Sequence, residues 1–528
     1  MRKLFAVLLL LAFPLSANEM SFRSLQSGWN SSATPLSDHG LHGEGQIIAV
    51  LDTGLDYDNC FFAEADGSAP PINTGTPAGG FNWTNIAPSR RKAIAYDFLY
   101  SCAQFPGAPY CDDPSDPTAY DNQGHGTHAA AAAAGDRGTP IVHDYGDAIA
   151  PGAKLVIQDA GLSPNDTCTS RPGIGCPVNL TPILDQAYKQ GARIHSNSWG
   201  DHGAPTASYS QAAHDLDAFV YSHPDMLVVF NVGNFGSPGI PPLNTLSSPG
   251  CAKNSLQVGG TREDYRDDSV LASYTLLGPA RDGRIKPDVV GPSYVLAADS
   301  DLDVRTKTCD ISYQPGTSWA SPSIAGAAAL ARQYYTDGYY PSGIPTPSDR
   351  FTPSAALLKA TMIAGARRVP IRAVYNSPDV ASMPVPSPEQ GWGFPVLGDV
   401  LHFPGDRSHL KVVEGEVALG QTATLRLQVN GGTPLRAVLV WTDPPGTNTG
   451  TAPNLVNDLD LRIGALPSQA DHINNVEVIT IDAPASGTYS IDVTASRLGF
   501  GSKQSYALVV TGDVSDAASV RARAVRAR

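Results

Sequence analysis

Basic residues are scarce in this 528-residue chain: Lys and Arg number 36 against 50 Asp and Glu, which gives a formal net charge of −14. Nucleic-acid binding depends on clustered Lys and Arg, so this balance argues against DNA or RNA as the main partner. Only 16% of the residues are charged and 42% are hydrophobic, which is typical of a globular chain. The excess of acidic residues is compatible with solubility outside the cell and with the binding of cations. The length of the chain is enough for more than one hydrophobic core.

Long apolar runs are also missing. A membrane-spanning helix needs about 18 or more apolar residues in succession, and no stretch of the chain reaches that length. One shorter apolar run, residues 4–13, follows Arg2 and Lys3 and precedes Pro-Leu-Ser-Ala, a pattern typical of a signal peptide. We therefore predict a signal peptide over residues 1–17 and export to the periplasm or the medium, without a membrane span.

Cysteine is sparse, with seven residues in the chain. Their spacings do not resemble a zinc site, and an exported protein would hold cysteines in disulfides. The sequence alone does not fix which cysteines pair, so we take the closest-spaced pairs first. The working prediction is Cys102–Cys111, Cys168–Cys176 and Cys251–Cys309, with Cys60 left over.

Three apolar segments each lead into residues that could carry chemistry. Residues 46–51 end at Asp52 in an Asp-Thr-Gly sequence, residues 192–196 lead into Asn-Ser-Trp-Gly, and residues 226–232 lead into Gly-Asn at Asn234. Such runs, alternating with helical patterns, indicate buried parallel strands of an α/β fold. Parallel strands in these folds build sites at their carboxyl ends, so we expect a shared sheet edge. Taken alone, Asp52 could equally well cap a turn.

Two further motifs supply a histidine and a serine. His125 lies in Gly-His-Gly-Thr-His before an alanine block, and Ser318 lies in Gly-Thr-Ser-Trp-Ala-Ser-Pro before an apolar run that indicates a buried helix. A helix N-terminus favours the negative charge that develops when a serine attacks a carbonyl. Taken alone, Ser318 would more simply be an N-cap, and lone histidines are usually structural or on the surface. We interpret His128 as structural.

The order of these residues identifies the pattern. Asp52, His125 and Ser318 follow the subtilisin triad order, and not the order of α/β-hydrolases or chymotrypsin. Together with Asn234 in Val-Gly-Asn, these motifs resemble the subtilisin-like serine peptidases. The resemblance implies that Ser318 attacks the peptide carbonyl, His125 transfers its proton, Asp52 orients the imidazole and Asn234 binds the oxyanion. It also implies that the substrate backbone contacts Ser198, Trp199, Gly200 and Gly233.

The character of the sequence changes after about residue 400. We assign residues 18–400 to the α/β peptidase domain, a mostly parallel sheet flanked by helices, in which residues 18–45 contain no long periodic element. Short strand-like segments separated by turn residues predict an all-β jelly roll or sandwich over residues 401–513. Residues 514–528 are expected to form a disordered basic tail.

Two more motifs, residues 282–288 and 455–461, are similar to a branch of oxidatively stable alkaline subtilases that carry a C-terminal β-barrel. This resemblance suggests structural Ca²⁺, because Asn457, Asp458 and Asp460 offer hard oxygen ligands in a loop-like segment. The alternative is a turn cluster in which these side chains bond the backbone. We expect no cofactor for the chemistry itself.

Two residues depart from the family pattern. Trp319 follows the serine where the family usually has methionine, and indole lacks the sulfoxide chemistry of a thioether, so we expect resistance to peroxide. Phe235 follows Asn234, and no neighbouring carboxylate is present in sequence to attract a basic side chain. We therefore expect a preference for apolar or aromatic P1 residues.

The leading interpretation is a secreted, monomeric serine endopeptidase of broad specificity that forms an acyl-enzyme with protein or peptide substrates. One alternative is a non-catalytic protein whose barrel binds a cell surface or polymer. Another is an esterase that uses the same nucleophile. A complete triad with Asn234 argues against the non-catalytic alternative, because a scaffold has no need of all four residues.

Overall fold

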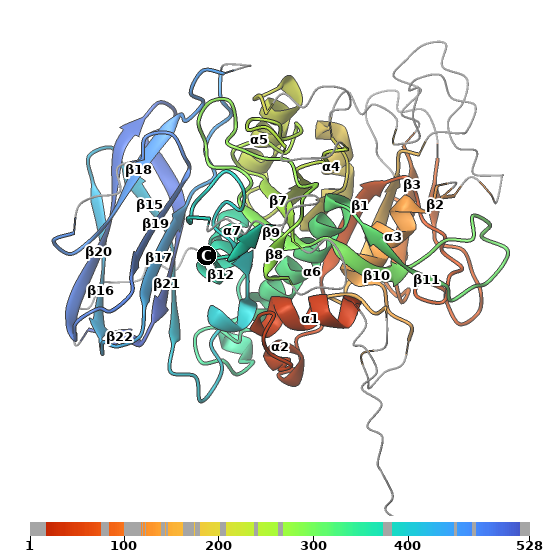
Figure 1. The fold of residues 1–528 in the computed structure, drawn as a ribbon, viewed down its shortest axis with the longest axis horizontal. Helices are drawn as coiled ribbons and strands as arrows, with labels where there is room; N and C mark the ends of the chain where they lie inside the picture. Colours follow the sequence, from red (N-terminus) through yellow and green to blue (C-terminus); the bar gives the residue numbers. More distant parts are fainter. Residues whose placement is uncertain are drawn as a thin grey trace, which may run out of the picture.

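The computed structural model contains an α/β part built around one large sheet and a β-sandwich formed by the C-terminal segment (Figure 1). The predicted signal peptide up to residue 16, most of the predicted tail, and the predicted disulfides Cys102–Cys111 and Cys168–Cys176 lie outside the described residues. The structure describes residues 17–517 except 75–83, 100–117, 119, 122, 139–142, 144–145, 162–173, 175–179, 201–206, 237–240, 262–267, 373–382, 448–450 and 467–470.

The α/β part is organised around a ten-stranded sheet with the order β13-β8-β7-β6-β5-β1-β4-β3-β2, in which β9 also pairs with β7. Among the described strands, every pairing in this sheet is parallel except that of β7 with β8. The predicted fold class, a mostly parallel sheet flanked by helices, is confirmed. The strands are β1 (Ile47–Asp52), β2 (Ile72–Asn73), β3 (Ala93–Phe98), β4 (Lys154–Asp159), β5 (Ile194–Asn197), β6 (Leu227–Asn231), β7 (Leu256–Thr261), β8 (Val270–Leu271), β9 (Val289–Pro292) and β13 (Ile371–Arg372).

Two helices at the centre of this part, α3 (His125–Ala134) and α6 (Thr317–Thr336), pack against each other and against β1. Small residues allow their close approach, because a Cβ on Gly326 would lie 2.9 Å from Ala133 O. Among the described helices, none is both long and apolar enough to cross a membrane. The other helices are α1 (Ala17–Ser27), α2 (Pro35–Asp38), α4 (Thr181–Lys189), α5 (Gln211–Ser222), α7 (Ala355–Ala364), η2 (Pro347–Asp349) and η3 (Leu397–Asp399).

The parallel register brings three strand ends to one edge of the sheet. Leu51 of β1 is paired with Asn197 of β5, and Asn197 is paired with Phe230 of β6. Asp52, the last residue of β1, therefore lies at the same height in the sheet as the residues that follow β5 and β6. The predicted shared edge is present, and it lies at the N-terminus of α6, which contacts β5 and β6.

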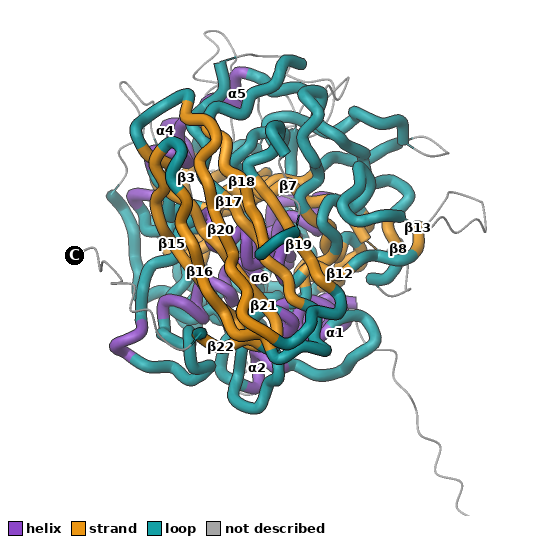
Figure 2. Tube along the Cα trace, turned by 90° about the vertical axis from the view of Figure 1, so that its left-hand side faces the viewer, coloured by secondary structure: helices purple, strands orange, loops and turns teal. Residues whose placement is uncertain are grey.

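The C-terminal part is a sandwich of two antiparallel sheets, with the orders β15-β21-β17-β19 and β18-β20-β16-β22 (Figure 2). Leu439, Leu459 and Leu508, which are buried in one core, come from both sheets. This confirms the predicted all-β segment. Its strands are β15 (His409–Ala418), β16 (Thr422–Val429), β17 (Leu435–Val440), β18 (Asn457–Ile463), β19 (Val476–Ile481), β20 (Gly487–Leu498), β21 (Lys503–Gly512) and β22 (Val514–Asp516). The α/β part also contains two two-stranded sheets, formed by β10 (Tyr294–Ala298) with β11 (Ile311–Pro315) and by β12 (Ala366–Arg367) with β14 (Phe394–Pro395).

The two parts share a buried interface. Every residue of α7 is buried, because α7 contacts β6 and α6 on one side and β17 and β21 of the sandwich on the other. Lys253 Nζ donates to Asp443 Oδ2 at 2.5 Å and to Asn454 O at 2.8 Å, and neither charged side chain is exposed. The sandwich is therefore fixed to the α/β part by apolar packing and by a fully buried ion pair.

The motif at residues 282–288 belongs to this interface. Ile285 N donates to Asn474 Oδ1 of the sandwich at 2.7 Å. Asp288 accepts from Lys286 Nζ at 2.6 Å and from Lys359 Nζ at 2.8 Å, all buried. This motif thus stabilises the junction between the two parts.

The expectation that residues 18–45 lack a long element is wrong. Ala17–Ser27 forms helix α1, and Phe22 and Leu25 of this helix are buried in the main core. The two apolar positions are too few to produce a periodic pattern, so the helix depends on its tertiary contacts.

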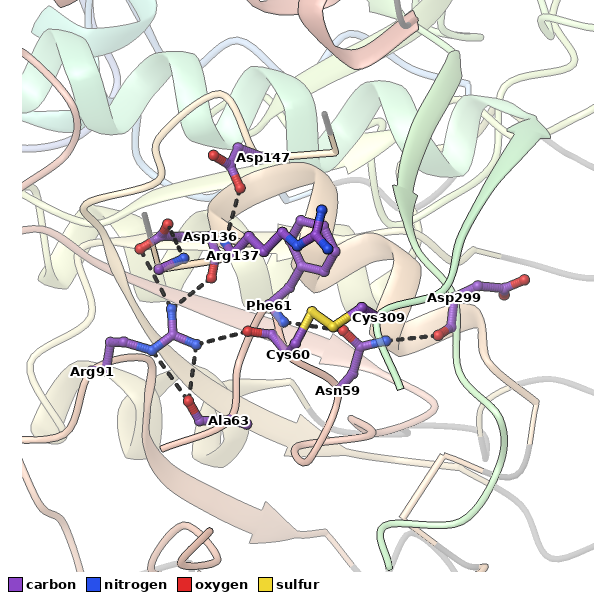
Figure 3. Close-up of a disulfide and its surroundings, with 11 residues drawn as sticks. Asn59, Cys60, Phe61, Ala63, Arg91, Asp136, Arg137, Asp147, Asp299 and Cys309 are labelled. Atoms are coloured by element: carbon purple, nitrogen blue, oxygen red, sulfur yellow. Dashed lines mark hydrogen bonds and ion pairs between the residues drawn. A yellow bond between two sulfur atoms is a disulfide. The ribbon is translucent and has the colours of Figure 1, made fainter. Parts of the chain in front are cut away.

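The predicted disulfide Cys251–Cys309 is also wrong. Cys309 is bonded to Cys60, with a Cα–Cα distance of 5.1 Å (Figure 3). The two segments are held side by side by Cys60 N, which donates to Thr308 O at 2.8 Å, and by Asn59 Nδ2, which donates to Asp299 O at 2.9 Å. Cys251 is a buried thiol.

The predicted disordered tail begins too early. Val514–Asp516 forms β22, which pairs with β16, and Val514 is buried in the sandwich core. The end of the sandwich therefore includes residues that had been assigned to the tail.

Candidate active site

The end of β1 and the start of α3 bring an aspartate and a histidine together. His125 Nδ1 lies 2.6 Å from Asp52 Oδ1, which also accepts from Thr53 N at 2.8 Å. The side chain of Asp52 is 2% exposed and that of His125 is 32% exposed. Burial lowers the pKa of His125, but the charge and hydrogen bond of Asp52 outweigh burial and raise the pKa overall. A partly exposed imidazole oriented by a buried carboxylate can accept and return a proton.

Glycines in both motifs allow this contact. Gly54 has φ +112°, and a Cβ there would lie 1.8 Å from Tyr120 O. A Cβ on Gly126 would lie 2.2 Å from Gly54 O. The two motifs therefore touch backbone to backbone, which fixes Asp52 relative to His125.

A second buried carboxylate, Asp121, supports the histidine loop. Its Oδ1 accepts from Thr53 Oγ1 at 2.8 Å and from Gly124 N at 2.9 Å, and its Oδ2 accepts from Thr127 N at 2.7 Å. Burial raises the pKa of Asp121 to about 6 despite these bonds. The sequence interpretation gave Asp121 no role, although its position four residues before His125 was an available signal.

Ser318 is the second residue of α6 and is 8% exposed. Ser198 Oγ donates to Ser318 O at 2.6 Å. That carbonyl has no helical partner at Pro322, because proline lacks an N–H. Ser318 Oγ itself lies 3.5 Å from Ser198 O.

The predicted contact between Ser318 Oγ and the His125 imidazole is not formed in this structure. Within the described residues, no hydrogen bond joins Ser318 Oγ to His125. The start of α6 nevertheless contacts His125, because the ring of Trp319, the residue after Ser318, lies 4.7 Å from the His125 ring between centroids. Rotation of the serine hydroxyl from Ser198 O toward the imidazole is needed, and such contacts often tighten when substrate binds.

Asn234 presents its amide to the same space. Its Oδ1 accepts from Thr317 N at 2.8 Å and from Thr317 Oγ1 at 3.0 Å, which directs Nδ2 away from Thr317. A Cβ on Gly316 would lie 3.6 Å from Asn234 Nδ2 and 3.8 Å from Ser318 N. Both nitrogens therefore lie near one point beside Ser318, where an oxyanion would need hydrogen-bond donors. Thr317, which orients the amide, was missed from the sequence.

Comparison with known proteins gives the family. The sequence matches the subtilase family over residues 43–393, about two thirds of the chain. The chain belongs to the subtilase family. Members of this family are serine-type peptidases, so the match agrees with the motifs around Asp52, His125 and Ser318.

Individual relatives are distant from this subtilase. The Serine protease/ABC transporter B family protein tagA of Dictyostelium discoideum is 25% identical over 94% of this chain and 32% of its own length. Serine protease AprX of Bacillus subtilis is 25% identical over 41% of this chain and 50% of its own length. A solved structure titled "S41 Psychrophilic Protease" is 20% identical, covers 71% of this chain and 97% of its own, and gives a TM-score of 0.45. The chain spans about a third of the length of the first curated relatives.

The segments predicted to bind substrate in this subtilase lie beside Ser318. Ser198, Trp199 and Gly200 follow β5, and a Cβ on Gly200 would lie 2.7 Å from Ser247 Oγ. Gly233 has φ +92°, and a Cβ there would lie 2.9 Å from the same atom. A side chain at either position would collide with Ser247, so packing alone accounts for both glycines, in addition to any contact with substrate.

His128 lies behind the site. Both of its ring nitrogens are buried, and burial lowers its pKa to about 3 against the smaller opposing effect of the backbone of Val295 and Ala298. Its ring lies 4.3 Å from the Trp319 ring between centroids. A neutral, enclosed imidazole agrees with the structural interpretation of this histidine.

The three predicted metal ligands lie in strand β18 and not in a loop. The side chain of Asn457 is hydrogen-bonded to Phe500: its Nδ2 donates to Phe500 O and its Oδ1 accepts from Phe500 N. Asp458 and Asp460 do approach each other, with His472 as an unpredicted third member. One possible ligand atom from each of these three lies within 4.8 Å of the others.

Proposed function

We propose that this subtilase is an exported serine endopeptidase that cleaves peptide bonds through an acyl-enzyme on Ser318. The observation that carries the proposal is the 2.6 Å contact of His125 Nδ1 with buried Asp52, beside Ser318 at the start of α6. The N-terminal sequence supports export. Protein or peptide substrates and a monomeric state belong to the same proposal.

In the first half of the reaction, Ser318 Oγ attacks the peptide carbonyl carbon while His125 Nε2 takes its proton. Asp52 holds Nδ1–H and stabilises the imidazolium. The imidazolium then gives the proton to the leaving amine, the C–N bond breaks and the acyl-enzyme remains. Water repeats the sequence to release the acid. The raised pKa of His125 favours the protonated form that the second step uses.

The oxyanion of the tetrahedral intermediate would lie between Asn234 Nδ2 and Ser318 N. Thr317 holds the amide in place, so the donor needs no reorganisation during the reaction. The backbone after β5, at Ser198, Trp199 and Gly200, would pair with the substrate as an added strand, and Gly233 would line the same cleft.

The proposal is tested by digestion of denatured casein, with the cleavage sites mapped by mass spectrometry. Internal cleavage that is absent with the Ser318→Ala variant is expected. Peptide and ester turnover are measured in parallel. Turnover of esters alone would identify an esterase, and turnover of neither by folded protein would overturn the catalytic assignment.

Apolar P1 residues are expected to be preferred by at least about tenfold in kcat/KM over Lys and Arg. Gly233 and Asn234 lie beside an apolar cluster against which Phe235 packs; the cluster contains Ala207, Val232, Leu246, Cys251 and Leu276. A peptide library randomised at P1 measures the preference. Strong selection of Lys or Arg would contradict it.

Peroxide is expected to leave most of the activity intact. Trp319 replaces the methionine that usually follows the serine, and Met226, Met362 and Met383 are buried. Residual activity is measured after mild peroxide treatment. The matched control is Trp319→Met, which should lose activity under the same treatment. Equal rapid loss in both proteins would show that Trp319 confers no protection.

We also propose a structural Ca²⁺ held by Asp458 and Asp460. Oδ1 of each is buried without a hydrogen-bond partner, which is unfavourable for a carboxylate unless a cation approaches. Asp458 Oδ2 lies 2.8 Å from His472 Nδ1. The imidazole is the weaker part of the fit, because Ca²⁺ prefers oxygen ligands.

The calcium proposal predicts that a chelator lowers the melting temperature of the wild type and that added Ca²⁺ restores it. Scanning calorimetry of the Ser318→Ala variant avoids autolysis during the measurement. Asp460→Asn in the same background should respond little to chelator. An unchanged melting temperature contradicts the site, and restoration by Zn²⁺ but not by Ca²⁺ contradicts the choice of ion.

A further inference from the structure

Trp319 is placed to act on the catalytic base. It follows Ser318 in α6, is 3% exposed, and lies with its ring 4.7 Å from the His125 ring between centroids at an interplanar angle of 40°. A cation within about 6 Å of an indole centroid is attracted by the negative face of the ring, and more strongly when water is excluded. The neutral imidazole of His125 gains little from this contact, whereas the imidazolium gains from it.

We propose that Trp319 is a positioning residue that stabilises the imidazolium of His125 through its indole face. The inference deepens the proposed function, on which it rests, because the imidazolium exists only while His125 carries the serine proton. Asp52 and Trp319 would then both stabilise the charged His125 ring. The carboxylate binds Nδ1, and the indole contacts the imidazole ring.

The other titratable groups around His125 do not replace this contribution. Asp52 on β1 and Asp121 on the loop before α3 both favour the imidazolium. His128 on α3 lies on the indole as well, with 4.3 Å between ring centroids, but burial lowers its pKa to about 3, so it stays neutral. The indole thus contacts two imidazoles: the pKa of His125 is raised by the charge of Asp52 and its hydrogen bond, which outweigh burial, whereas burial lowers that of His128.

The indole can be exchanged without breaking a hydrogen bond. Nε1 of Trp319 is buried and has no hydrogen-bond partner among the described residues. Removal of the N–H therefore leaves no acceptor unsatisfied. Changes in the ring then report on its π face and on packing, and these two contributions can be separated.

The experiment measures the pKa of His125 by NMR titration in the Ser318→Ala background, so it does not depend on catalysis. Trp319→Leu is expected to lower the pKa by about half a unit or more, with Trp319→Phe between Leu and Trp. Site-specific replacement of Trp319 by mono-, di- and trifluorotryptophan weakens the π face at nearly constant shape. A stepwise fall of the pKa with fluorine number is expected.

Two controls complete the test. Trp29→Phe, at a tryptophan packed on Phe394 away from the site, should leave the pKa of His125 unchanged. In active enzyme, the acid limb of the kcat/KM profile should move to lower pH in Trp319→Leu, because the imidazolium loses stabilisation. A pKa that is independent of fluorination would overturn the inference and leave Trp319 as packing only. Absence of proteolysis by the wild type would instead refute the proposed function, whatever the titration shows.

Discussion

Replacing Ser318 with alanine is expected to lower kcat for peptide hydrolysis by five to six orders of magnitude, close to the background rate. In a subtilisin-type triad, loss of the nucleophile alone costs about 10⁶-fold, because the remaining groups act only through it. Here Ser318 lies at the start of α6, and the next residue, Trp319, has its ring 4.7 Å from the His125 ring between centroids. Single-turnover and steady-state assays with a peptide substrate measure the loss.

The matched control is Ser321→Ala, one turn further along α6. Ser321 is fully buried and its Oγ has no hydrogen-bond partner among the described residues, so the change should leave kcat nearly unaltered. The double variant Ser318→Ala with His125→Ala should be no slower than Ser318→Ala alone. Residual activity above about 1% in Ser318→Ala would show that another residue is the nucleophile.

Replacing Lys253 with methionine is expected to destabilise the folded protein by about 3–5 kcal/mol, because it leaves the Asp443 carboxylate buried and unpaired. Asp443 and Lys253 are both fully buried. Burial already raises the pKa of Asp443, and Lys253 is the main group that opposes this rise. Urea unfolding of the Ser318→Ala protein, followed by fluorescence and circular dichroism, measures the change.

Lys503→Met supplies the control for this stability measurement. Lys503 lies 3.6 Å from Glu416, and both side chains are more than half exposed, so little change is expected. Lys253→Met combined with Asp443→Leu should recover part of the loss, because no charge is then left buried. If Lys253→Met unfolds at the same urea concentration as Lys503→Met, the ion pair does not hold the two parts together.

The parts of the fold that could be predicted from sequence are those with local signals. Apolar runs placed β1, β5 and β6 correctly, and the small-residue blocks placed α3 and α6. Helix α1 was missed because only Phe22 and Leu25 mark its buried side. Strand β18 was taken for a loop because its Asp and Asn residues are typical of turns, whereas cross-strand bonding to β20 decides its conformation.

Contacts between distant segments were the least accessible from sequence. Cys60 and Cys309 are 249 residues apart, and only the fold brings them together. Asp121 lies shortly before the histidine motif and Thr317 lies within the serine motif, but their contributions depend on hydrogen bonds to Thr53 and Asn234, which the sequence does not show. The contact of His472 with Asp458 also joins two separate segments, so the sequence did not indicate it. The roles of Asp52, His125, Ser318 and Asn234 remain predictions.

The most direct test of the proposed site is covalent labelling with a fluorophosphonate, which reacts with a serine activated by a neighbouring base. After digestion, mass spectrometry should locate the label on Ser318. Labelling should be far slower in His125→Ala and absent from that position in Ser318→Ala. Folded wild-type protein that is not labelled at Ser318, or is labelled equally fast without His125, would contradict the account.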